Sequence, residues 1–317
     1  MLLLTAETIR SLAPMAHVIA ALEEEFRHGC HTPPRQVIDL PAQGDGSLFL
    51  IMPAFGRDGD AAVKLATVLP GNPAKGLPVI QAAIVVFGAS GALEAVLDGT
   101  TVTHLRTGAA SALASKHLSR LESACLAVMG TGALAPSMAA AHCAVRPIER
   151  INVWGRRSDR AQRTAADIRK VISSNIDVVV CADPREAVTS ADIVSCATSS
   201  ISPILAGKWL KAGTFVDLVG SFSPAKREAD DDVVRGARIF VDTWEGALSE
   251  AGDLLLPMQA GAIRREDIKG ELADLVAGRV AGRMDAQQIT VFKSVGTALE
   301  DLATARLLVG LARAKGN

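Results

Sequence analysis

Two groups of residues in this 317-residue sequence have types and spacings suited to chemistry, and the first is a glycine-rich run. The run GTGALAP follows the apolar segment CLAVM and opens a small-residue helix pattern. Its G-x-G-x-x-A spacing permits a tight turn, a close backbone approach to a pyrophosphate and close helix–strand packing. A plain turn between a strand and a helix is the alternative, and the strand–helix alternation after the run favours a dinucleotide site. The predicted pyrophosphate contacts are Gly130, Thr131, Gly132, Ala133 and Leu134.

The end of the next predicted strand indicates which dinucleotide binds. NAD-specific sites place Asp or Glu there, to accept a hydrogen bond from the ribose 2′-hydroxyl. Here the strand INVW is followed by Gly155, Arg156, Arg157 and Ser158. Two guanidiniums and a hydroxyl suit a 2′-phosphate, although two solvated loop arginines would look the same. The sequence therefore predicts NADPH, with NADH as the alternative cofactor.

The second group consists of three cations in apolar or tight contexts. Arg35 follows TPP, Lys64 interrupts AAVKLATV, and Arg106 lies in THLRTGAAS. A lysine within an apolar strand either extends to water at a sheet edge or is buried with an anionic partner. Three such positions beside a dinucleotide domain predict a carboxylate-binding pocket, but spacing alone does not show that they converge.

The elements that position these residues follow from changes of pattern along the chain. Residues 1–30 have helical periodicity with Thr5 as the cap, and residues 35–98 alternate like short strands. After residue 120, apolar strands alternate with helical segments, and the C-terminus is an amphipathic helix. We predict an α/β protein. It has a Rossmann-type doubly wound domain (118–293) and a smaller α+β substrate domain (1–117 with 294–317).

Composition excludes several classes of protein. Hydrophobic residues make up 49%, charged residues 21%, and the net charge of −1 comes without a basic stripe, which argues against a nucleic-acid partner. Apolar runs are too short for a membrane span. Five scattered cysteines without a CxxC pair predict reduced thiols and no metal site. We expect a soluble, cytoplasmic protein with a small-molecule substrate. The histidines at 104, 117 and 142 are interpreted as structural.

Six blocks in order resemble the ornithine cyclodeaminase/mu-crystallin family over nearly the whole chain: AVKLATVLPGNPAKGLP, THLRTGAASALASKHL, GTGALAP, ATSSISPIL, LVGSFSPAKRE and VFKSVGTALEDLATA. The resemblance implies a homodimer formed through the β-rich domain, which the C-terminal helix completes. It also implies that Arg35, Lys64 and Arg106 are the carboxylate-binding and catalytic cations. It extends the cofactor site to Arg106, Thr107, Thr198, Val219, Gly220, Ser221, Ser294 and Gly296.

One block departs from the cyclodeaminases, which read VGGDCPG with an aspartate that manages the reacting amine. Here Ser221 and Phe222 lie over those positions, and Phe222 offers no carboxylate. This version resembles the ketimine reductase branch. It implies NADPH-dependent reduction of Δ1-pyrroline-2-carboxylate, and of Δ1-piperideine-2-carboxylate, to L-proline and L-pipecolate. An ornithine cyclodeaminase, an alanine-type dehydrogenase and a mu-crystallin-like NADPH-dependent ligand-binding protein remain as alternatives. Retention of all three cations favours catalysis.

Overall fold

The computed structural model describes residues 1–44 and 46–316, and it divides the chain into two units. The first unit holds residues 1–106 and 297–317, and the second holds residues 107–296. The sequence places the divisions at 117/118 and 293/294 instead. In the structure the first division falls inside a continuous helix, α3 (Gly99–Leu118), so no linker composition marks it.

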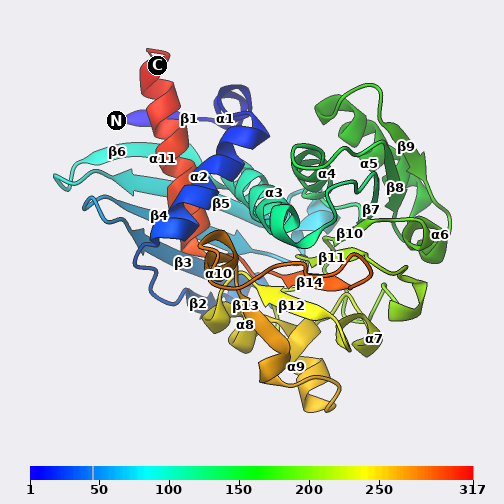
Figure 1. The fold of residues 1–317 in the computed structure, drawn as a ribbon. Helices are drawn as coiled ribbons and strands as arrows, with labels where there is room; N and C mark the ends of the chain where they lie inside the picture. Colours follow the sequence, from blue (N-terminus) through cyan, green and yellow to red (C-terminus); the bar gives the residue numbers. More distant parts are fainter. Residues whose placement is uncertain (45, 317) are drawn as a thin grey trace. The chain divides into compact units, whose positions relative to one another are not determined.

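A six-stranded sheet forms the body of the first unit (Figure 1). Its order is β1-β6-β5-β4-β3-β2, with β1 parallel to β6 and the other neighbours antiparallel. Buried and half-buried residues alternate along β3 and β4, which is the period of two expected of strands. The strands are β1 (Leu2–Leu4), β2 (Gln36–Asp39), β3 (Leu48–Phe55), β4 (Ala61–Val68), β5 (Ile80–Phe87) and β6 (Leu93–Asp98).

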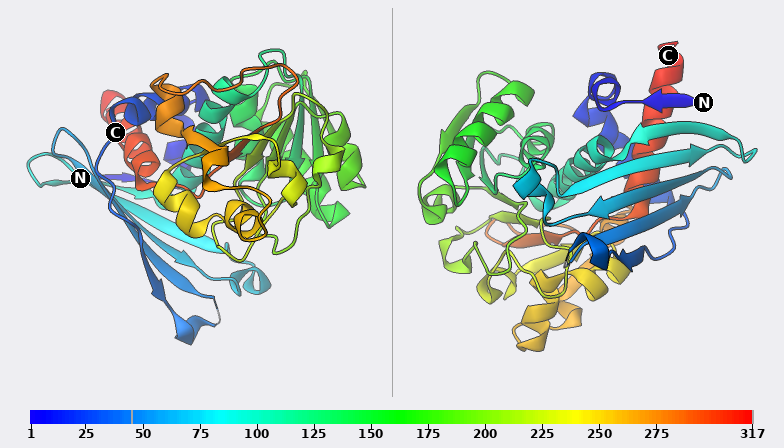
Figure 2. Two further views of the ribbon diagram at one scale, coloured as in Figure 1. Left: turned by 60° about the horizontal axis from the view of Figure 1, so that its bottom comes forward. Right: turned by 180° about the vertical axis from the view of Figure 1, so that it is seen from behind.

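Helices of the first unit cover one face of this sheet. The C-terminal helix α11 contacts β3, β4, β5 and the helices α1 and α2, as predicted for a helix that returns to the N-terminal domain. Figure 2 (right) shows the strands in front of the red helix α11, so the opposite face of the sheet is toward the viewer. The helical elements are α1 (Ala6–Leu12), α2 (Met15–His28), the 3-10 turns η1 (Pro41–Gln43) and η2 (Asn72–Lys75), and α11 (Ala298–Ala314).

The prediction of one helix over residues 1–30 is wrong. Leu2–Leu4 pair with β6 as a strand, and helix α1 ends before Pro14. Proline forces the preceding residue toward extended backbone, and Ala13 has φ −122° and ψ 107°. The predicted cap is confirmed, since the Thr5 side chain accepts a hydrogen bond from the Thr8 amide at 3.3 Å.

The second unit is built on eight parallel strands in the order β13-β12-β14-β11-β10-β7-β8-β9. The predicted α/β class with a Rossmann-type sheet is confirmed. The sequence missed β13 and β14, and β14 inserts between β11 and β12. The strands are β7 (Cys125–Met129), β8 (Arg150–Trp154), β9 (Asp177–Val180), β10 (Ile193–Cys196), β11 (Phe215–Leu218), β12 (Arg238–Val241), β13 (Ile268–Glu271) and β14 (Thr290–Lys293).

The helices of the second unit are mostly short. Among the helices in the part of the chain that the structure describes, none is both long and apolar enough to cross a membrane. They are α4 (Ala135–Cys143), α5 (Ser158–Val171), α6 (Pro184–Thr189), η3 (Gly207–Trp209), α7 (Asp231–Val234), α8 (Trp244–Glu250), α9 (Gly252–Gln259), η4 (Arg265–Asp267) and α10 (Leu272–Val276).

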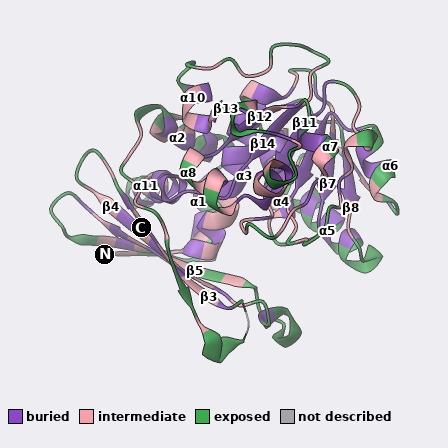
Figure 3. Cartoon of the chain, turned by 90° about the horizontal axis from the view of Figure 1, so that it is seen from below, coloured by how far each residue is buried: buried purple, intermediate pink, exposed green. Residues whose placement is uncertain are grey.

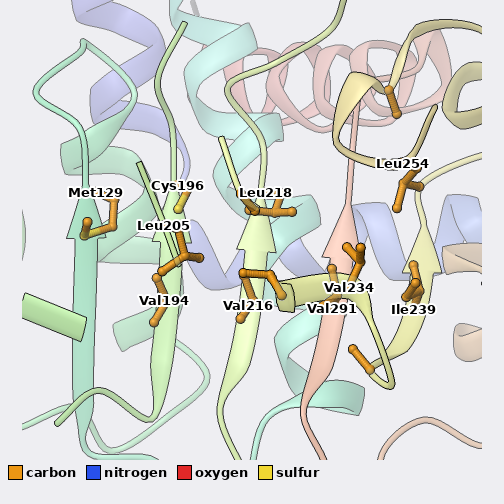
Figure 4. Close-up of a cluster of buried hydrophobic side chains, with 14 of the residues drawn as sticks. Met129, Val194, Cys196, Leu205, Val216, Leu218, Val234, Ile239, Leu254 and Val291 are labelled. Atoms are coloured by element: carbon orange, nitrogen blue, oxygen red, sulfur yellow. The ribbon is translucent and has the colours of Figure 1, made fainter. Parts of the chain in front are cut away.

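The core of the second unit lies along its parallel strands. Met129, Cys196, Leu218 and Val291 come from four neighbouring strands, and their side chains line one cluster of fully buried residues (Figure 4). In Figure 3 the inner residues of β7 and β8 are coloured as buried, whereas the strands of the first unit mix buried and half-buried residues. A sheet buried on both faces suits parallel strands, and it gives the strand ends of this unit a rigid base.

Candidate functional site

The glycine turn leaves the carboxyl end of β7 and enters helix α4. Gly130 has φ +126°, a conformation that favours glycine. A Cβ at Gly130 would lie 2.8 Å from Thr198 Cγ2 and 3.0 Å from the Ala197 oxygen, so a larger residue would collide with the end of β10. A Cβ at Gly132 would find its nearest neighbour only at 3.8 Å, and this residue is exposed. The turn therefore packs against the end of β10 at Gly130 and is accessible at Gly132, as an approaching pyrophosphate requires.

The predicted cofactor residues of the second unit gather at one edge of the parallel sheet. Because all eight strands run the same way, the carboxyl ends of β7, β8, β10, β11 and β14 lie on the same side. The strand order reverses between β7 and β10, and ligands of open α/β sheets bind at such switch points. Residues that follow these strand ends are Gly130, Thr131, Gly132, Ala133 and Leu134 after β7, Gly155, Arg156, Arg157 and Ser158 after β8, Thr198 after β10, Val219, Gly220 and Ser221 after β11, and Ser294 and Gly296 after β14.

Helix α3 supplies one more predicted cofactor residue to the second unit. Thr107 is buried, and the neighbouring Gly108 packs against helix α4, since a Cβ there would lie 2.8 Å from the Ser137 oxygen. The small residues of the RTGAAS block thus let the two helices approach closely. Arg106, predicted for both cofactor and substrate, falls in the first unit.

The β8 end carries the residues predicted to select the dinucleotide. Gly155 packs tightly, because a Cβ there would lie 2.4 Å from Thr131 Cγ2. Arg156 and Arg157 are exposed. Arg157 donates two hydrogen bonds to Asp159, Nε to Oδ1 at 3.1 Å and Nη2 to Oδ2 at 2.8 Å. Asp159 is a nearby carboxylate that the sequence argument did not consider, and its bonds with Arg157 lower its pKa.

Lys64 is buried in the first unit with an anionic partner. It lies on β4, a central strand, and its Nζ is 2.7 Å from Asp301 Oδ2. Arg106 lies 2.6 Å from Glu300 through Nη1, and 3.3 Å from Asp301 through Nε. Desolvation lowers the pKa of Lys64 to about 8, with Asp301 opposing that change and Arg106 and Arg35 adding to it. Lys64 and Arg106 are therefore brought together at Asp301, and Arg35 is near enough to influence the pKa of Lys64.

Glu300 and Asp301 are the acidic partners of these cations, and the sequence reasoning did not identify them. Both lie in the first turn of α11 and both are buried, with exposures of 0% and 1%. Two adjacent acids in a small-residue helix are the available signal, but a helix start also attracts carboxylates through its dipole. Two of the three predicted cations, Lys64 and Arg106, are thus paired with buried carboxylates.

The segment after β11 holds no carboxylate at the two positions singled out in the sequence. The Ser221 hydroxyl is buried and donates to the Lys226 oxygen at 2.7 Å. Phe222 packs on the apolar core cluster of the second unit. Neither side chain can hold an ammonium by charge.

His142 differs from the other two histidines in its surroundings. It is fully buried, its Nε2 lies 3.3 Å from Asp217 Oδ2, and the hydroxyls of Ser111 and Ser195 donate to the same carboxylate. The cluster joins α3, α4, β10 and β11 inside the second unit, which agrees with a structural role. Across residues 1–44 and 46–316, no group of three or more His, Cys, Asp or Glu residues is placed to hold a metal ion, and the five cysteines are free.

Comparison with known proteins links this geometry to one family. The sequence pattern of the ornithine cyclodeaminase/mu-crystallin family matches residues 1–316. The Δ1-pyrroline-2-carboxylate reductase of Colwellia psychrerythraea is 36% identical over 313 residues, covering 98% of each chain. The same enzyme from Thermococcus litoralis, solved with NADH and L-proline, superposes with a TM-score of 0.95 at 35% identity, over 100% of this chain and 98% of that one. An archaeal alanine dehydrogenase dimer with bound NAD gives a TM-score of 0.91 at 30% identity, over 100% and 97%.

Proposed function

Because this chain belongs to the ornithine cyclodeaminase/mu-crystallin family, we propose that it is an NAD(P)H-dependent imino acid reductase. Its substrate is Δ1-pyrroline-2-carboxylate, with Δ1-piperideine-2-carboxylate as the six-membered homologue, and its products are L-proline and L-pipecolate. The observation that carries the proposal is the pair of buried cations, Lys64 and Arg106, held by Asp301 and Glu300, with a Lys64 pKa of about 8. The Colwellia and Thermococcus reductases support this choice of substrate.

The reaction needs a held carboxylate, a proton on the imine nitrogen and a hydride at C2. Arg35 and Arg106 pair with the substrate carboxylate, because planar guanidiniums match its two oxygens. Lys64 adds charge and delivers a proton toward the nitrogen, for which a pKa of about 8 is well placed near neutrality. The reduced nicotinamide, when bound, supplies the hydride. One hydride and one proton convert the C=N bond to CH–NH, and the dinucleotide leaves oxidised.

NADPH is the proposed dinucleotide, with NADH as the alternative. Arg156 and Arg157 stand exposed where a 2′-phosphate would lie, and the bond from Arg157 to Asp159 is a solvent-exposed pair that a phosphate can replace at little cost. Asp159 also offers a carboxylate near the same place, which is the feature that would favour NADH. The Thermococcus reductase was solved with NADH.

A homodimer is the proposed assembly, because apolar residues line the face of the six-stranded sheet opposite α11. Strand register aligns Pro53, Val63, Val85 and Val96 in one row across four strands, and the next row holds Ile51, Leu65 and Ala83 and ends at Asp98. Sheets with one face in water normally carry polar residues there. A second copy of this chain would bury the rows. Light scattering should give twice the 33.0 kDa chain mass at micromolar concentration, and a monomer would refute the assembly.

The five free cysteines agree with a reducing, cytoplasmic location.

One set of parallel assays tests the reaction. The purified protein is given NADPH or NADH with Δ1-pyrroline-2-carboxylate, with Δ1-piperideine-2-carboxylate, with pyruvate plus ammonia, or with no substrate. Oxidation of NADPH only with the cyclic imines, with proline or pipecolate as product, is expected. Turnover of pyruvate plus ammonia would indicate an alanine-type dehydrogenase, an activity favoured by the 30% identical archaeal enzyme. Tight NADPH binding without turnover would indicate a ligand-binding protein.

A further inference from the structure

Glu228, a residue outside the predicted cofactor site, is fully buried behind the edge where that site lies. Its Oε1 accepts hydrogen bonds from the Thr198 amide at 2.6 Å and the Thr198 hydroxyl at 2.8 Å. Its Oε2 accepts one from the Gly220 amide at 2.7 Å. Thr198 follows β10 and Gly220 follows β11, so a single carboxylate joins two neighbouring strand ends.

The joined strand ends press directly on the glycine turn. A Cβ at Gly220 would lie 2.0 Å from the Thr198 oxygen, which shows how closely the two backbones pass. On its other side Thr198 contacts Gly130, where a Cβ would lie 2.8 Å from Thr198 Cγ2. A shift of Thr198 would therefore move or release the turn that receives the pyrophosphate.

Glu228 is itself fixed by two further buried charges. The amides of Glu228 and Ala229 donate to Asp253 Oδ1 at 2.7 and 3.1 Å. The second oxygen of Asp253 lies 3.0 Å from Lys293 Nζ, which donates to the Ser221 oxygen at 2.6 Å. Segment 220–228 is thus held at both ends from α9 and β14, and its carboxylate has little freedom to move.

The charges around Glu228 make its protonation responsive near neutrality. Desolvation and the charge of Asp253 raise its pKa to about 7, against Lys293 and the Thr198 hydrogen bonds, which lower it. Asp253 faces it from α9, Lys293 from β14 and Cys196 from β10, and burial raises the pKa of that thiol well above its usual value. Ionised Glu228 is the stronger acceptor for its three donors.

We propose that Glu228 is a positioning residue for the dinucleotide: by tying Thr198 and Gly220 together it holds the β10 end against the glycine turn in the shape that receives the pyrophosphate. The inference rests on the proposed dinucleotide site but not on the identity of the imine substrate. Glu228 makes its effect through Thr198 and Gly220 rather than by touching the reacting atoms.

Glu228→Gln tests the proposal with little change of size. The side-chain NH2 group of the new glutamine is a donor. It would replace one of the two oxygens that accept hydrogen bonds from the Thr198 and Gly220 amides. Dissociation constants for NADPH, measured at pH 8 by nucleotide fluorescence without substrate, should rise roughly tenfold to a hundredfold. Glu186→Gln is the matched control, because it removes an exposed carboxylate from the same unit and should leave the constant unchanged.

A pH series separates positioning from a merely structural contribution. As pH falls from 8 to 6, wild-type Glu228 takes up a proton, so wild-type affinity falls toward that of Glu228→Gln. The titration of the 2′-phosphate is common to both proteins and cancels in the ratio of their dissociation constants. Asp253→Asn keeps an acceptor for the Glu228 amide but removes the negative charge of Asp253. The pKa of Glu228 should then fall, so the pH at which NADPH affinity changes should be lower in this variant than in the wild type. This variant retains Glu228 and serves if Glu228→Gln does not fold.

Three results would overturn the inference, and they differ from one another. Equal NADPH affinity of wild type and Glu228→Gln would refute the positioning role and leave the proposed reductase intact. A second result would show that Glu228 only stabilises the fold. The ratio of the two NADPH dissociation constants would not change with pH, and Asp253→Asn would not shift the pH at which affinity changes. Failure of the wild type to bind either dinucleotide would refute the proposed function itself.

Discussion

Lys64→Met is the substitution that most directly tests the carboxylate pocket. It keeps the length of the side chain but removes a charge that the structure places 2.7 Å from Asp301. Loss of a desolvated charge partner typically costs about 2–5 kcal/mol, so kcat/KM for the cyclic imine should fall roughly a hundredfold or more. The fall should appear mainly in kcat, because the proton source is lost together with the charge.

The same substitution should also destabilise the first unit, and this effect must be separated from the chemical one. Without Lys64, Asp301 still lies 3.3 Å from Arg106 Nε but has lost its nearer cation. Breaking a buried pair by removing one partner costs about 3–5 kcal/mol. Adding Asp301→Asn removes the stranded charge. The double variant should therefore recover much of the melting temperature without recovering kcat/KM.

The assay follows NADPH oxidation with Δ1-pyrroline-2-carboxylate, with NADPH binding measured in parallel. Binding should be near normal, since the glycine turn lies in the other unit. If Lys64→Met keeps native-like activity with an intact fold, the pocket assignment is wrong, and the result favours a ligand-binding protein over a reductase. If the double variant recovers activity along with stability, Lys64 is structural rather than catalytic.

Three further predictions concern pH, cofactor choice and the departure from the cyclodeaminases. The rate of imine reduction should fall as pH rises through about 8, because Lys64, whose pKa is lowered in the fold, loses its proton above that pH. A pH–rate profile of Lys64→Arg should lack this fall at high pH. Changing Arg156 and Arg157 to Ala should raise the KM for NADPH selectively, and a wild type that prefers NADH would contradict the assignment. Phe222→Asp should not improve imine reduction and should introduce a trace of ornithine turnover, detectable as ammonia release; faster imine reduction would show that the apolar residue is not suited to this substrate.

Local periodicity predicts much of this fold, and the exceptions have physical causes. The apolar strand runs and the cap at Thr5 were predicted because a period of two and a capping hydroxyl are local signals. The short run Leu2–Leu4 gains its strand state from pairing with β6, more than 90 positions along the chain, which no local pattern reports. The residues of strand β14 carry no local strand signal that separates them from the block before the last helix, and the place of β14 between β11 and β12 depends on tertiary pairing.

The candidate site shows the same division between local and distant signals. Lys64 within an apolar strand predicts a buried charge with an anionic partner, and the structure provides one. That partner, Asp301, is separated from it by most of the chain, so its identity could not be deduced from spacing. Likewise the glycine turn is evident from its motif. The role of Glu228 depends on the contact between Thr198 and Gly130, which exists only once β7 and β10 are paired.

The pairing of acids with cations explains how one pocket can be both buried and receptive. Without a carboxylate partner, Lys64 at 4% exposure would have a still lower pKa, because burial disfavours the charged ammonium. Asp301 opposes that shift, so the pKa settles at about 8 and the ammonium persists at neutral pH. Arg106 is held in the same way by Glu300. The acids thus fix both cations before a ligand arrives, which is the preorganisation that binding a substrate carboxylate would use.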